Sequence, residues 1–237
     1  MDVSAHYDLR GTDALRQSAP VEISSAFSSP YKFVENLIPV TKQRGVFLDL
    51  CCGTGIHSVW AAKKGYKVFG VDLSSRSIEA ARKNVVGGDF FIEDALLFLD
   101  RPQKYDVIFI SGSLYYFDLD QILPKIFIAL NEGGRFVCVE TFGSSFLMNG
   151  YRKMMSRFSK RRDRASVEDL LSEDDLEILN KYFPSGTVRF FDFLTLGLVV
   201  LPHFLLTPLK CFDFWLLNKL GLNRLSFKFV FWGDKPR

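Results

Sequence analysis

The sequence predicts a parallel, doubly wound α/β sheet of the Rossmann type within one domain of 237 residues. Three observations support this fold class. Hydrophobic residues make up 48% of the chain and aromatic residues 15%, which favours a packed core over disorder. Between about residues 45 and 141, short runs of β-branched and aromatic residues alternate with helical patterns. The first of these runs ends in a glycine turn, as the first strand of a nucleotide-binding sheet does.

Residues 45–141 contain the elements of this sheet in order. Five strands are expected, over Val46–Leu50, Lys67–Val71, Phe90–Ile92, Tyr105–Ile110 and Arg135–Glu140. Helices are expected over His57–Lys64, Ser75–Asn84 and Leu119–Leu130. Gly65 ends the first helix, and Ser74 or Ser75 caps the second. Because strands alternate with helices, right-handed crossovers connect successive strands and leave them parallel.

The pattern changes after Thr141. Residues 142–186 form a predicted helical cap, with a basic amphipathic helix at 146–164 and a second helix over Ser172–Tyr182. Residues 152–164 hold seven basic residues against one Asp. Residues 187–237 contain two further strands, Thr187–Leu194 and Leu225–Trp232. The apolar insert between them, at 195–224, is expected to form short helices.

Charge and cysteine content limit the classes of function. The net charge of +3 is too small to predict a nucleic-acid-binding protein. The cysteines suit reduced thiols in a cytoplasmic protein, and no further ligands accompany Cys51-Cys52, so no metal site is predicted. The first residues lack the pattern of a secretory signal. Phe193–Leu209 is a long uncharged stretch, but Pro202 and Pro208 interrupt it, so no transmembrane helix is expected.

The turn after the first strand, Asp49-Leu50-Cys51-Cys52-Gly53-Thr54-Gly55, has the features of a ligand-binding loop. Small residues let the backbone approach a ligand, and the helix that follows directs its positive end toward it. The spacing of Gly53 and Gly55 alone is a weak dinucleotide signature. Asp49 distinguishes a dinucleotide from a ligand that carries an amino group, because a carboxylate there would repel a pyrophosphate but suit an ammonium group. S-adenosylmethionine has an amino acid and a sulfonium where a dinucleotide has phosphates. We therefore predict it as the cofactor, with S-adenosylhomocysteine as the product.

Two further acids follow the next two strands. Asp72 ends the second strand, beside Leu73, where its carboxylate can accept hydrogen bonds from both ribose hydroxyl groups. Asp94 follows the third strand and can accept a hydrogen bond from the adenine amino group. A single Asp at a strand end is more often a solvated turn or capping residue. Three of them in this order, after three successive strands, favour a nucleoside site.

These segments resemble the successive motifs of class I S-adenosylmethionine-dependent methyltransferases, of the small-molecule type with a methyltransferase domain. The matching stretches are 47–55, 68–75, 89–95, 105–113 and 131–136. The resemblance implies a seven-stranded sheet whose last strand runs antiparallel, with residues 45–141 as the cofactor-binding core. It also implies that Asp49 lies near the methionine moiety, Asp72 binds the ribose, Asp94 and Ala95 flank the adenine, and Ser111 and Ser113 face the sulfonium.

The chain departs from the family pattern at one position and extends it at the N-terminus. Cys51 replaces the usual first glycine of the loop, and we expect a slightly narrower choice of backbone there without loss of binding. Residues 1–44 resemble the leading helices that close over the cofactor, which would place Tyr7 against it. The alternative, that these residues merely cover the sheet, is equally supported.

The topology also suggests where an acceptor would bind. Ligands of open α/β sheets bind beyond the carboxyl ends of the parallel strands. The 142–186 cap and the 195–224 insert both begin at that edge, so we expect them to converge over the transferred methyl group. A basic helix beside an aromatic-rich insert favours a small hydrophobic acceptor, or peripheral association with the inner face of a membrane through 146–164 and 193–220. Ordinary core packing with a solvated basic face explains the same pattern equally well.

Methyl transfer from a sulfonium is an in-line displacement, so positioning supplies most of the catalysis, but a hydroxyl or ammonium acceptor also needs a base. The candidates are Tyr115, Tyr116 and His203, and His57 is less plausible. His203 is the only ionisable residue in its apolar stretch, although such a histidine is more often structural. Two other classes of function remain: a non-catalytic adenosylmethionine-binding or membrane-interaction protein, and a nicotinamide-dependent oxidoreductase, against which Asp49 argues. The identity of the acceptor and the oligomeric state stay open.

Overall fold

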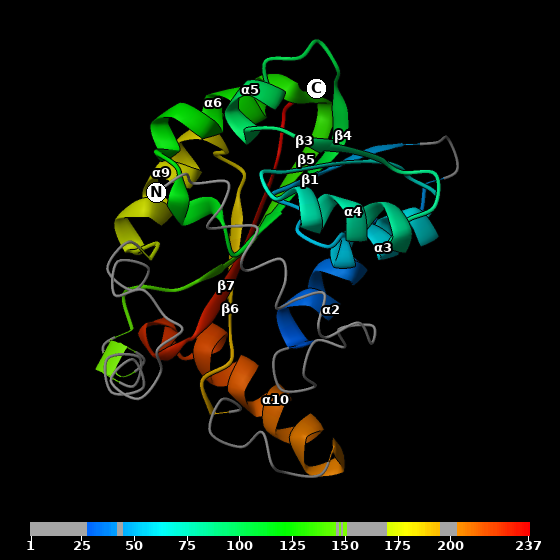
Figure 1. Ribbon diagram of the computed structural model, residues 1–237. Helices are drawn as coiled ribbons and strands as arrows, with labels where there is room; N and C mark the ends of the chain where they lie inside the picture. The colour runs from blue at the N-terminus through cyan, green and yellow to red at the C-terminus, as the bar shows by residue number, and fades with distance from the viewer. Residues whose placement is uncertain (1–27, 42–44, 146, 148, 151–169, 195–202) are drawn as a thin grey trace.

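The computed structural model describes residues 28–41, 45–145, 147, 149–150, 170–194 and 203–237. Its core is a seven-stranded sheet with the order β3-β2-β1-β4-β5-β7-β6 (Figure 1). The strands are β1 (Val46–Leu50), β2 (Lys67–Asp72), β3 (Asp89–Ile92), β4 (Tyr105–Ser111), β5 (Leu130–Thr141), β6 (Thr187–Phe191) and β7 (Lys228–Asp234). Strands β1 to β5 pair in parallel, whereas β7 runs antiparallel to both β5 and β6. The predicted fold class and the antiparallel last strand are confirmed.

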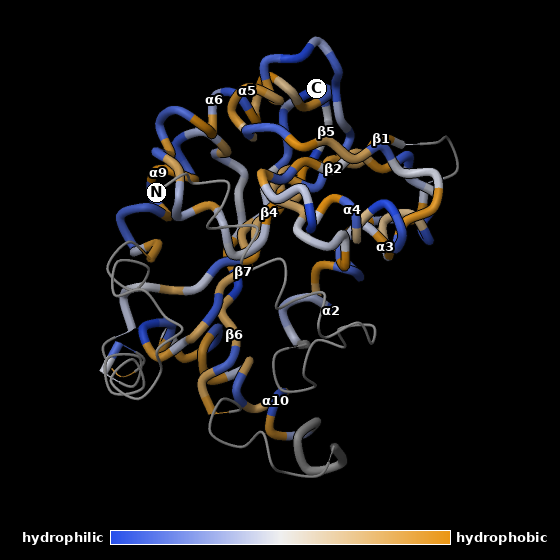
Figure 2. Tube along the Cα trace, viewed as in Figure 1, coloured by the Kyte–Doolittle hydropathy of each residue, from blue (hydrophilic) through white to orange (hydrophobic). Residues whose placement is uncertain are grey.

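Helices cover both faces of the sheet (Figure 1). One face carries α2 (Ser28–Leu37), α3 (Ile56–Lys63) and α4 (Ser75–Asn84). The other carries α5 (Ala95–Phe98), α6 (Leu119–Ala129) and α9 (Glu173–Tyr182). Each set of helices packs on its own hydrophobic cluster, and Figure 2 shows largely hydrophobic strands between them. Strands buried on both faces need such continuous apolar runs, which is why the five central strands were predictable.

Serine caps begin two of the helices. Ser74 accepts a hydrogen bond from the backbone N–H of Ser77 at the start of α4. Ser172 and Asp175 form a reciprocal capping box at the start of α9. Both predicted helix starts are therefore confirmed.

Three strand boundaries differ from the prediction by three residues or more. β5 begins at Leu130, directly after α6, because Leu130 already pairs with Tyr105 of β4. β6 ends at Phe191 rather than Leu194, where Asp192 takes a left-handed φ of 64° that no extended strand contains. β7 begins three residues later than expected, because a short 3-10 helix occupies Asn223–Leu225.

The described part of the apolar insert contains a 17-residue helix, α10 (His203–Lys219), which is longer than the short helices that we expected, and the start of the 3-10 helix at Asn223–Leu225. Leu217 is buried, and Phe214, one turn earlier on the same face, packs on Phe191 of β6. Residues 195–202 of the insert and most of the predicted basic helix lie outside the described residues. Among the helices that the structure describes, none is long and apolar enough to cross a bilayer.

Candidate cofactor site

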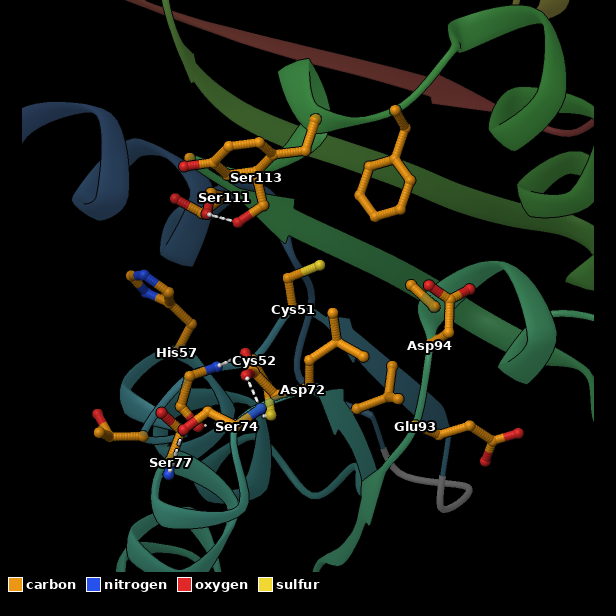
Figure 3. A pocket seen from close by; sticks show the side chains of 18 of the residues that line it. Cys51, Cys52, His57, Asp72, Ser74, Ser77, Glu93, Asp94, Ser111 and Ser113 are labelled. Atoms are coloured by element: carbon orange, nitrogen blue, oxygen red, sulfur yellow. Dashed lines mark hydrogen bonds between the residues drawn. The ribbon is translucent and has the colours of Figure 1, made fainter. Parts of the chain in front are cut away.

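A cavity of about 670 Å³ lies at the carboxyl ends of the parallel strands. Ten of the predicted site residues line it: Cys51, Gly53, Asp72, Leu73, Asp94, Ala95, Ser111, Ser113, Tyr115 and Tyr116. Figure 3 shows Asp94 at one end of the cavity and His57 with Ser111 toward the other, with Cys51 between them. The parallel topology brings these residues to one edge of the sheet although they come from separate loops.

The loop after β1 contains three residues with left-handed backbone conformations. The φ angles are 55° at Cys51, 51° at Gly53 and 72° at Gly55. A residue with a Cβ is strained by about 1–2 kcal/mol in this region, whereas glycine adopts it freely. Cys51 is therefore a strained residue, which is more than the slightly narrower choice of backbone that we expected.

Gly55 was predicted to contact the cofactor, but it does not line the cavity. A Cβ at Gly55 would lie 3.1 Å from the Cβ of Ala81 on α4. Its small size is thus needed where α3 packs on α4. The close approach of the two helices fixes the position of the loop that precedes α3.

Asp72 connects the end of β2 to the loop after β1. Its Oδ2 accepts a hydrogen bond from the Gly53 N–H at 2.9 Å, and its Oδ1 accepts one from the Ser74 N–H, also at 2.9 Å. A carboxylate oxygen can accept more than one hydrogen bond, so this anchoring leaves acceptor capacity for a ligand. Asp72 both shapes the loop and presents a carboxylate at the cavity wall.

Asp94 is the N-cap of α5. Its Oδ1 accepts hydrogen bonds from the backbone N–H groups of Leu96 at 2.8 Å and Leu97 at 3.3 Å. These two hydrogen bonds use Oδ1 and fix the direction of the Asp94 side chain. In Figure 3 the carboxylate stands at the end of the cavity farthest from His57.

Asp49 lies beneath the cavity rather than in its wall. The side chain is 2% exposed, and the hydroxyl of Ser58 on α3 donates a hydrogen bond to its Oδ2 at 2.6 Å. Burial raises the pKa of Asp49 to about 7, and the nearby Asp72 adds to the increase. The structure therefore places Asp49 behind the loop and outside the residues that line the cavity.

Glu140, at the end of β5, is a second buried carboxyl group close to the cavity. It is fully buried, and its Oε1 accepts hydrogen bonds from the backbone N–H groups of Ser113 at 3.0 Å and Leu114 at 2.9 Å. Burial raises the pKa of Glu140 to about 7. Sequence reasoning missed this residue because it reads simply as the last charged position of a buried strand.

When they are ionised, the carboxyl groups of Asp72, Glu140 and Asp49 make the potential around Cys51 negative. The pKa of the Cys51 thiol is raised first by burial and then by the charges of Asp72, Glu140 and Asp49. A negative potential that disfavours a thiolate favours a cation at the same place. The centre of the cavity is therefore suited to a positively charged group.

His57 lines the cavity, although the sequence suggested that it was a weak candidate. Its ring stacks on that of Tyr31 from α2, with centroids 4.7 Å apart. The Tyr31 hydroxyl is 3.2 Å from Ser111 Oγ and accepts a hydrogen bond from Lys228 Nζ at 3.1 Å. Nothing in the sequence links these positions, because α2 and β7 lie at opposite ends of the chain.

The predicted catalytic residues divide into two groups. Tyr115 and Tyr116 line the cavity, and the Tyr115 hydroxyl donates a hydrogen bond to that of Tyr116 at 2.9 Å. The side chain of His203 and the whole of Tyr7 lie outside the described residues, so both stay predictions. No described residue of the 142–186 cap or of α10 lines the cavity. The expected convergence of these segments over it is thus not seen in the part of the chain that is described.

Comparison with known proteins agrees with this geometry. Residues 47–134 match the methyltransferase domain family. Over this segment the chain is similar to S-adenosylmethionine-dependent methyltransferases. The matched segment runs from β1 to the start of β5, and it contains the loop, Asp72 and Asp94.

Two curated relatives illustrate the similarity. The demethylmenaquinone methyltransferase of Lactobacillus johnsonii is 31% identical over 104 residues, which are 40% of this chain and 43% of that protein. The trans-aconitate 2-methyltransferase of Variovorax paradoxus is 30% identical over 90 residues, which are 37% of this chain and 35% of that protein. The matches thus span less than half the length of these relatives.

Solved structures share the fold at low sequence identity. A plantazolicin methyltransferase in complex with a substrate analogue and S-adenosylhomocysteine has a TM-score of 0.58 and 17% identity, and the match covers 100% of this chain and 92% of that one. The geranyl diphosphate C-methyltransferase of Streptomyces coelicolor has a TM-score of 0.60 and 16% identity, covering 88% of this chain and 79% of that one. Likeness at this level concerns the fold.

Proposed function

We propose that the protein transfers a methyl group from S-adenosylmethionine to a small acceptor. One observation carries the proposal: a single cavity combines Asp72 and Asp94 with a negative potential at Cys51. Asp72 and Asp94 offer hydrogen-bond acceptors to a nucleoside, and the negative potential at Cys51 favours a cation. A nucleoside joined to a sulfonium satisfies both requirements, whereas a dinucleotide would bring phosphates into the negative centre.

We infer a position for each part of this cofactor from the residues that line the cavity. Asp94 and Ala95 would flank the adenine, and Asp72 would accept hydrogen bonds from the ribose hydroxyl groups. The sulfonium would then lie beside Cys51, and the methionine moiety would extend toward Ser111 and His57. Figure 3 shows Asp94 at one end of the cavity, His57 toward the other, and Cys51 between them.

The bound cofactor supplies an electrophilic methyl group. The chain contributes position and electrostatics: Asp72 and Glu140 hold the two loops on either side of Cys51 through backbone N–H groups. The paired hydroxyls of Tyr115 and Tyr116 are the polar groups at the rim that could orient an acceptor. Which of the two hydroxyls accepts a proton depends on whether the methylated atom is oxygen, nitrogen or carbon.

We further propose that the acceptor is hydrophobic or membrane-associated. α10 and the loop after it expose Phe212, Trp215, Leu220 and Leu222, and the rings of Phe212 and Trp215 are 50% and 48% exposed and stack on each other. Aromatic side chains beside lysines suit the interface between lipid and water. The relative named demethylmenaquinone methyltransferase acts, by its name, on a quinone, which agrees with a hydrophobic acceptor.

Calorimetry tests the cofactor. We expect S-adenosylmethionine and S-adenosylhomocysteine to bind, and NAD not to bind. Asp72→Asn should weaken both adenosyl ligands by about tenfold or more, because a charge-assisted hydrogen bond is worth about 1.5–3 kcal/mol. Asp118→Asn is the matched control, since Asp118 caps α6 outside the cavity. Binding of NAD in preference to both ligands would overturn the proposal.

Co-sedimentation with vesicles of anionic phospholipid tests the membrane association. We expect the wild-type protein to sediment with the vesicles. A Phe212→Ser, Trp215→Ser double variant should bind about thirtyfold less, because each half-exposed ring contributes on the order of 1 kcal/mol. Ile128→Ser is the control: Ile128 is 60% exposed but lies on α6. Equal sedimentation of the double variant and the wild type would contradict the association.

A further inference from the structure

Glu140 fixes the short 3-10 helix Leu114–Tyr116, which presents two tyrosines at the rim of the cavity. The Oε1 atom of Glu140 accepts hydrogen bonds from the backbone N–H groups of Ser113 at 3.0 Å and Leu114 at 2.9 Å. Ser113 is the N-cap of this helix, but its own side chain forms no capping hydrogen bond. The carboxyl group of Glu140, which comes from β5, supplies the cap instead.

The connection between β4 and this helix is short. β4 ends at Ser111, and the next backbone N–H, that of Gly112, donates to the Val139 carbonyl at 3.0 Å. Gly112 then turns the chain with a left-handed φ of 63°. The two N–H groups that follow bond to the Glu140 side chain rather than to a strand. The position of the rim therefore depends on how well this carboxyl group accepts hydrogen bonds.

The second oxygen of Glu140, Oε2, is buried and has no hydrogen-bond partner among the described residues. A buried carboxylate oxygen in this condition disfavours the ionised form. Burial accordingly raises the pKa of Glu140 to about 7, although the hydrogen bonds from Leu114 and Ser113 and the charge of Lys228 oppose the increase. The carboxyl group therefore changes between its neutral and ionised forms near neutral pH.

Glu140 faces titratable groups on two neighbouring elements and on its own strand. Lys228, at the start of β7, supplies a positive charge. Cys51, in the loop after β1, lines the cavity, and burial, Asp72 and Glu140 raise the pKa of its thiol. Cys138 lies two residues earlier on β5, where burial and then Glu140 raise the pKa of the thiol. The effect on Cys51 indicates that the charge of Glu140 acts at the centre of the cavity, where the sulfonium is proposed to lie.

We propose that Glu140 is a positioning residue that transmits the charge of the bound cofactor to the rim, by holding the helix Leu114–Tyr116 more tightly when a sulfonium is present. The inference rests on the proposed function and extends it to the control of acceptor binding. A cation beside Cys51 favours the ionised carboxyl, and an ionised acceptor forms hydrogen bonds about twice as strong as a neutral one. Tyr115 and Tyr116 are then held in place while a methyl group is available.

The same coupling loosens the rim after the reaction. Methyl transfer moves the carbon to the acceptor atom and leaves the bonding electron pair on sulfur, so the positive charge is lost. A hydrogen on the methylated atom leaves as a proton to the solvent. Glu140 can then take up a proton from the solvent on Oε2, which makes Oε1 a weaker, neutral acceptor for Ser113 and Leu114. The methylated acceptor is released from a rim that is held less tightly.

Amide hydrogen exchange at Ser113 and Leu114, resolved by NMR, tests the proposal without an identified acceptor. Three saturating ligands are compared at pH 6.5: S-adenosylmethionine, S-adenosylhomocysteine, and sinefungin, which has an ammonium group in place of the sulfonium methyl. The two ligands with a positive charge there should slow exchange about threefold more than S-adenosylhomocysteine. Lowering the pKa of Glu140 by about one unit from about 7 changes its ionised fraction by that factor. At pH 8.5 the carboxyl is ionised with every ligand, and the difference should disappear.

Two variants assign the effect to Glu140. Glu140→Gln keeps an oxygen that can accept both N–H groups but cannot ionise, so the three ligands should slow exchange equally. Glu132→Gln is the matched control, because Glu132 lies on the same strand but is exposed, and it should retain the wild-type difference.

Three outcomes contradict the positioning role alone. They are equal exchange with all three ligands in the wild type at pH 6.5, a difference that is unchanged at pH 8.5, and a difference that persists in Glu140→Gln. A wild-type protein that binds none of the three ligands would overturn the proposed function, and this inference with it.

Discussion

Replacing Asp49 with asparagine is expected to stabilise the protein, and more so at alkaline pH. Burial raises the pKa of Asp49 from 3.8 to about 7. Between these values the folded carboxyl keeps a proton that the unfolded one has lost, so the free energy of unfolding falls as pH rises through this window. The buried carboxyl therefore destabilises the fold by about 2 kcal/mol at pH 5.5 and about 4 kcal/mol at pH 8.

Urea unfolding at the two pH values measures this difference. The Asp49→Asn side chain retains an oxygen that can accept the hydrogen bond from Ser58, so the substitution mainly removes the ionisation. Its stability gain over the wild type should be about 2 kcal/mol larger at pH 8 than at pH 5.5. Other titrating groups are common to both proteins and cancel. Among them is His57, whose lowered pKa makes stability rise with pH up to about 6.5, the opposite direction.

An exposed control and a ligand measurement complete the experiment. Asp118→Asn replaces an exposed N-cap by an equally good one, and its effect should be the same at both pH values. Asp49→Asn should also reduce the preference for S-adenosylmethionine over S-adenosylhomocysteine by about tenfold at pH 8, because only the first carries a sulfonium charge. The reasoning is refuted if the stability gain is independent of pH, or if the preference for the charged ligand is unchanged.

Three further substitutions test other parts of the site, each by urea unfolding. Cys51→Gly should raise the free energy of unfolding by about 1 kcal/mol by relieving the φ of 55°, and a loss of stability would contradict the strain. Gly55→Ala should lower the free energy of unfolding by at least about 2 kcal/mol, because the new Cβ would lie 3.1 Å from Ala81 and the residue keeps a positive φ. Gly53→Ala should lower it by only about 1 kcal/mol, because its Cβ would meet nothing within 4 Å. Equal losses would argue against packing as the cause. Between pH 5.5 and 8 the wild type should lose about 2 kcal/mol of unfolding free energy through Glu140, whose pKa is raised from 4.5 to about 7, and Glu140→Gln should not show this loss. An unchanged pH dependence in the variant would contradict this.

The sheet was predictable because its strands are buried on both faces. A strand such as β4, with four consecutive buried residues, reads as a continuous apolar run whatever surrounds it. The loop and the acids at the strand ends follow from the same regularity, since their positions are fixed by where each strand stops. Ten cavity-lining residues could be named from these positions together with the family resemblance and the search for a base.

Features that depend on tertiary packing could not be predicted. Lys228 and Tyr31 are 197 residues apart, and only the antiparallel entry of β7 brings the start of that strand to the cavity edge. Asp49 shows a different limit: its position in the loop was evident, but its inward orientation depends on Ser58 one turn into α3. The length of α10 likewise depends on how it packs on β6, because Pro208 within it predicts an interruption.

The buried acids are more consistent with function than with stability. Asp49 and Glu140 each ionise near neutral pH at a cost to the fold of about 3–4 kcal/mol, and a neutral side chain could make the same hydrogen bonds. Their charge becomes useful only when a cation occupies the centre of the cavity, where it would lower both pKa values and recover part of that cost as binding energy. Affinity for a sulfonium ligand should therefore rise as pH increases through 7, while affinity for a neutral thioether changes less.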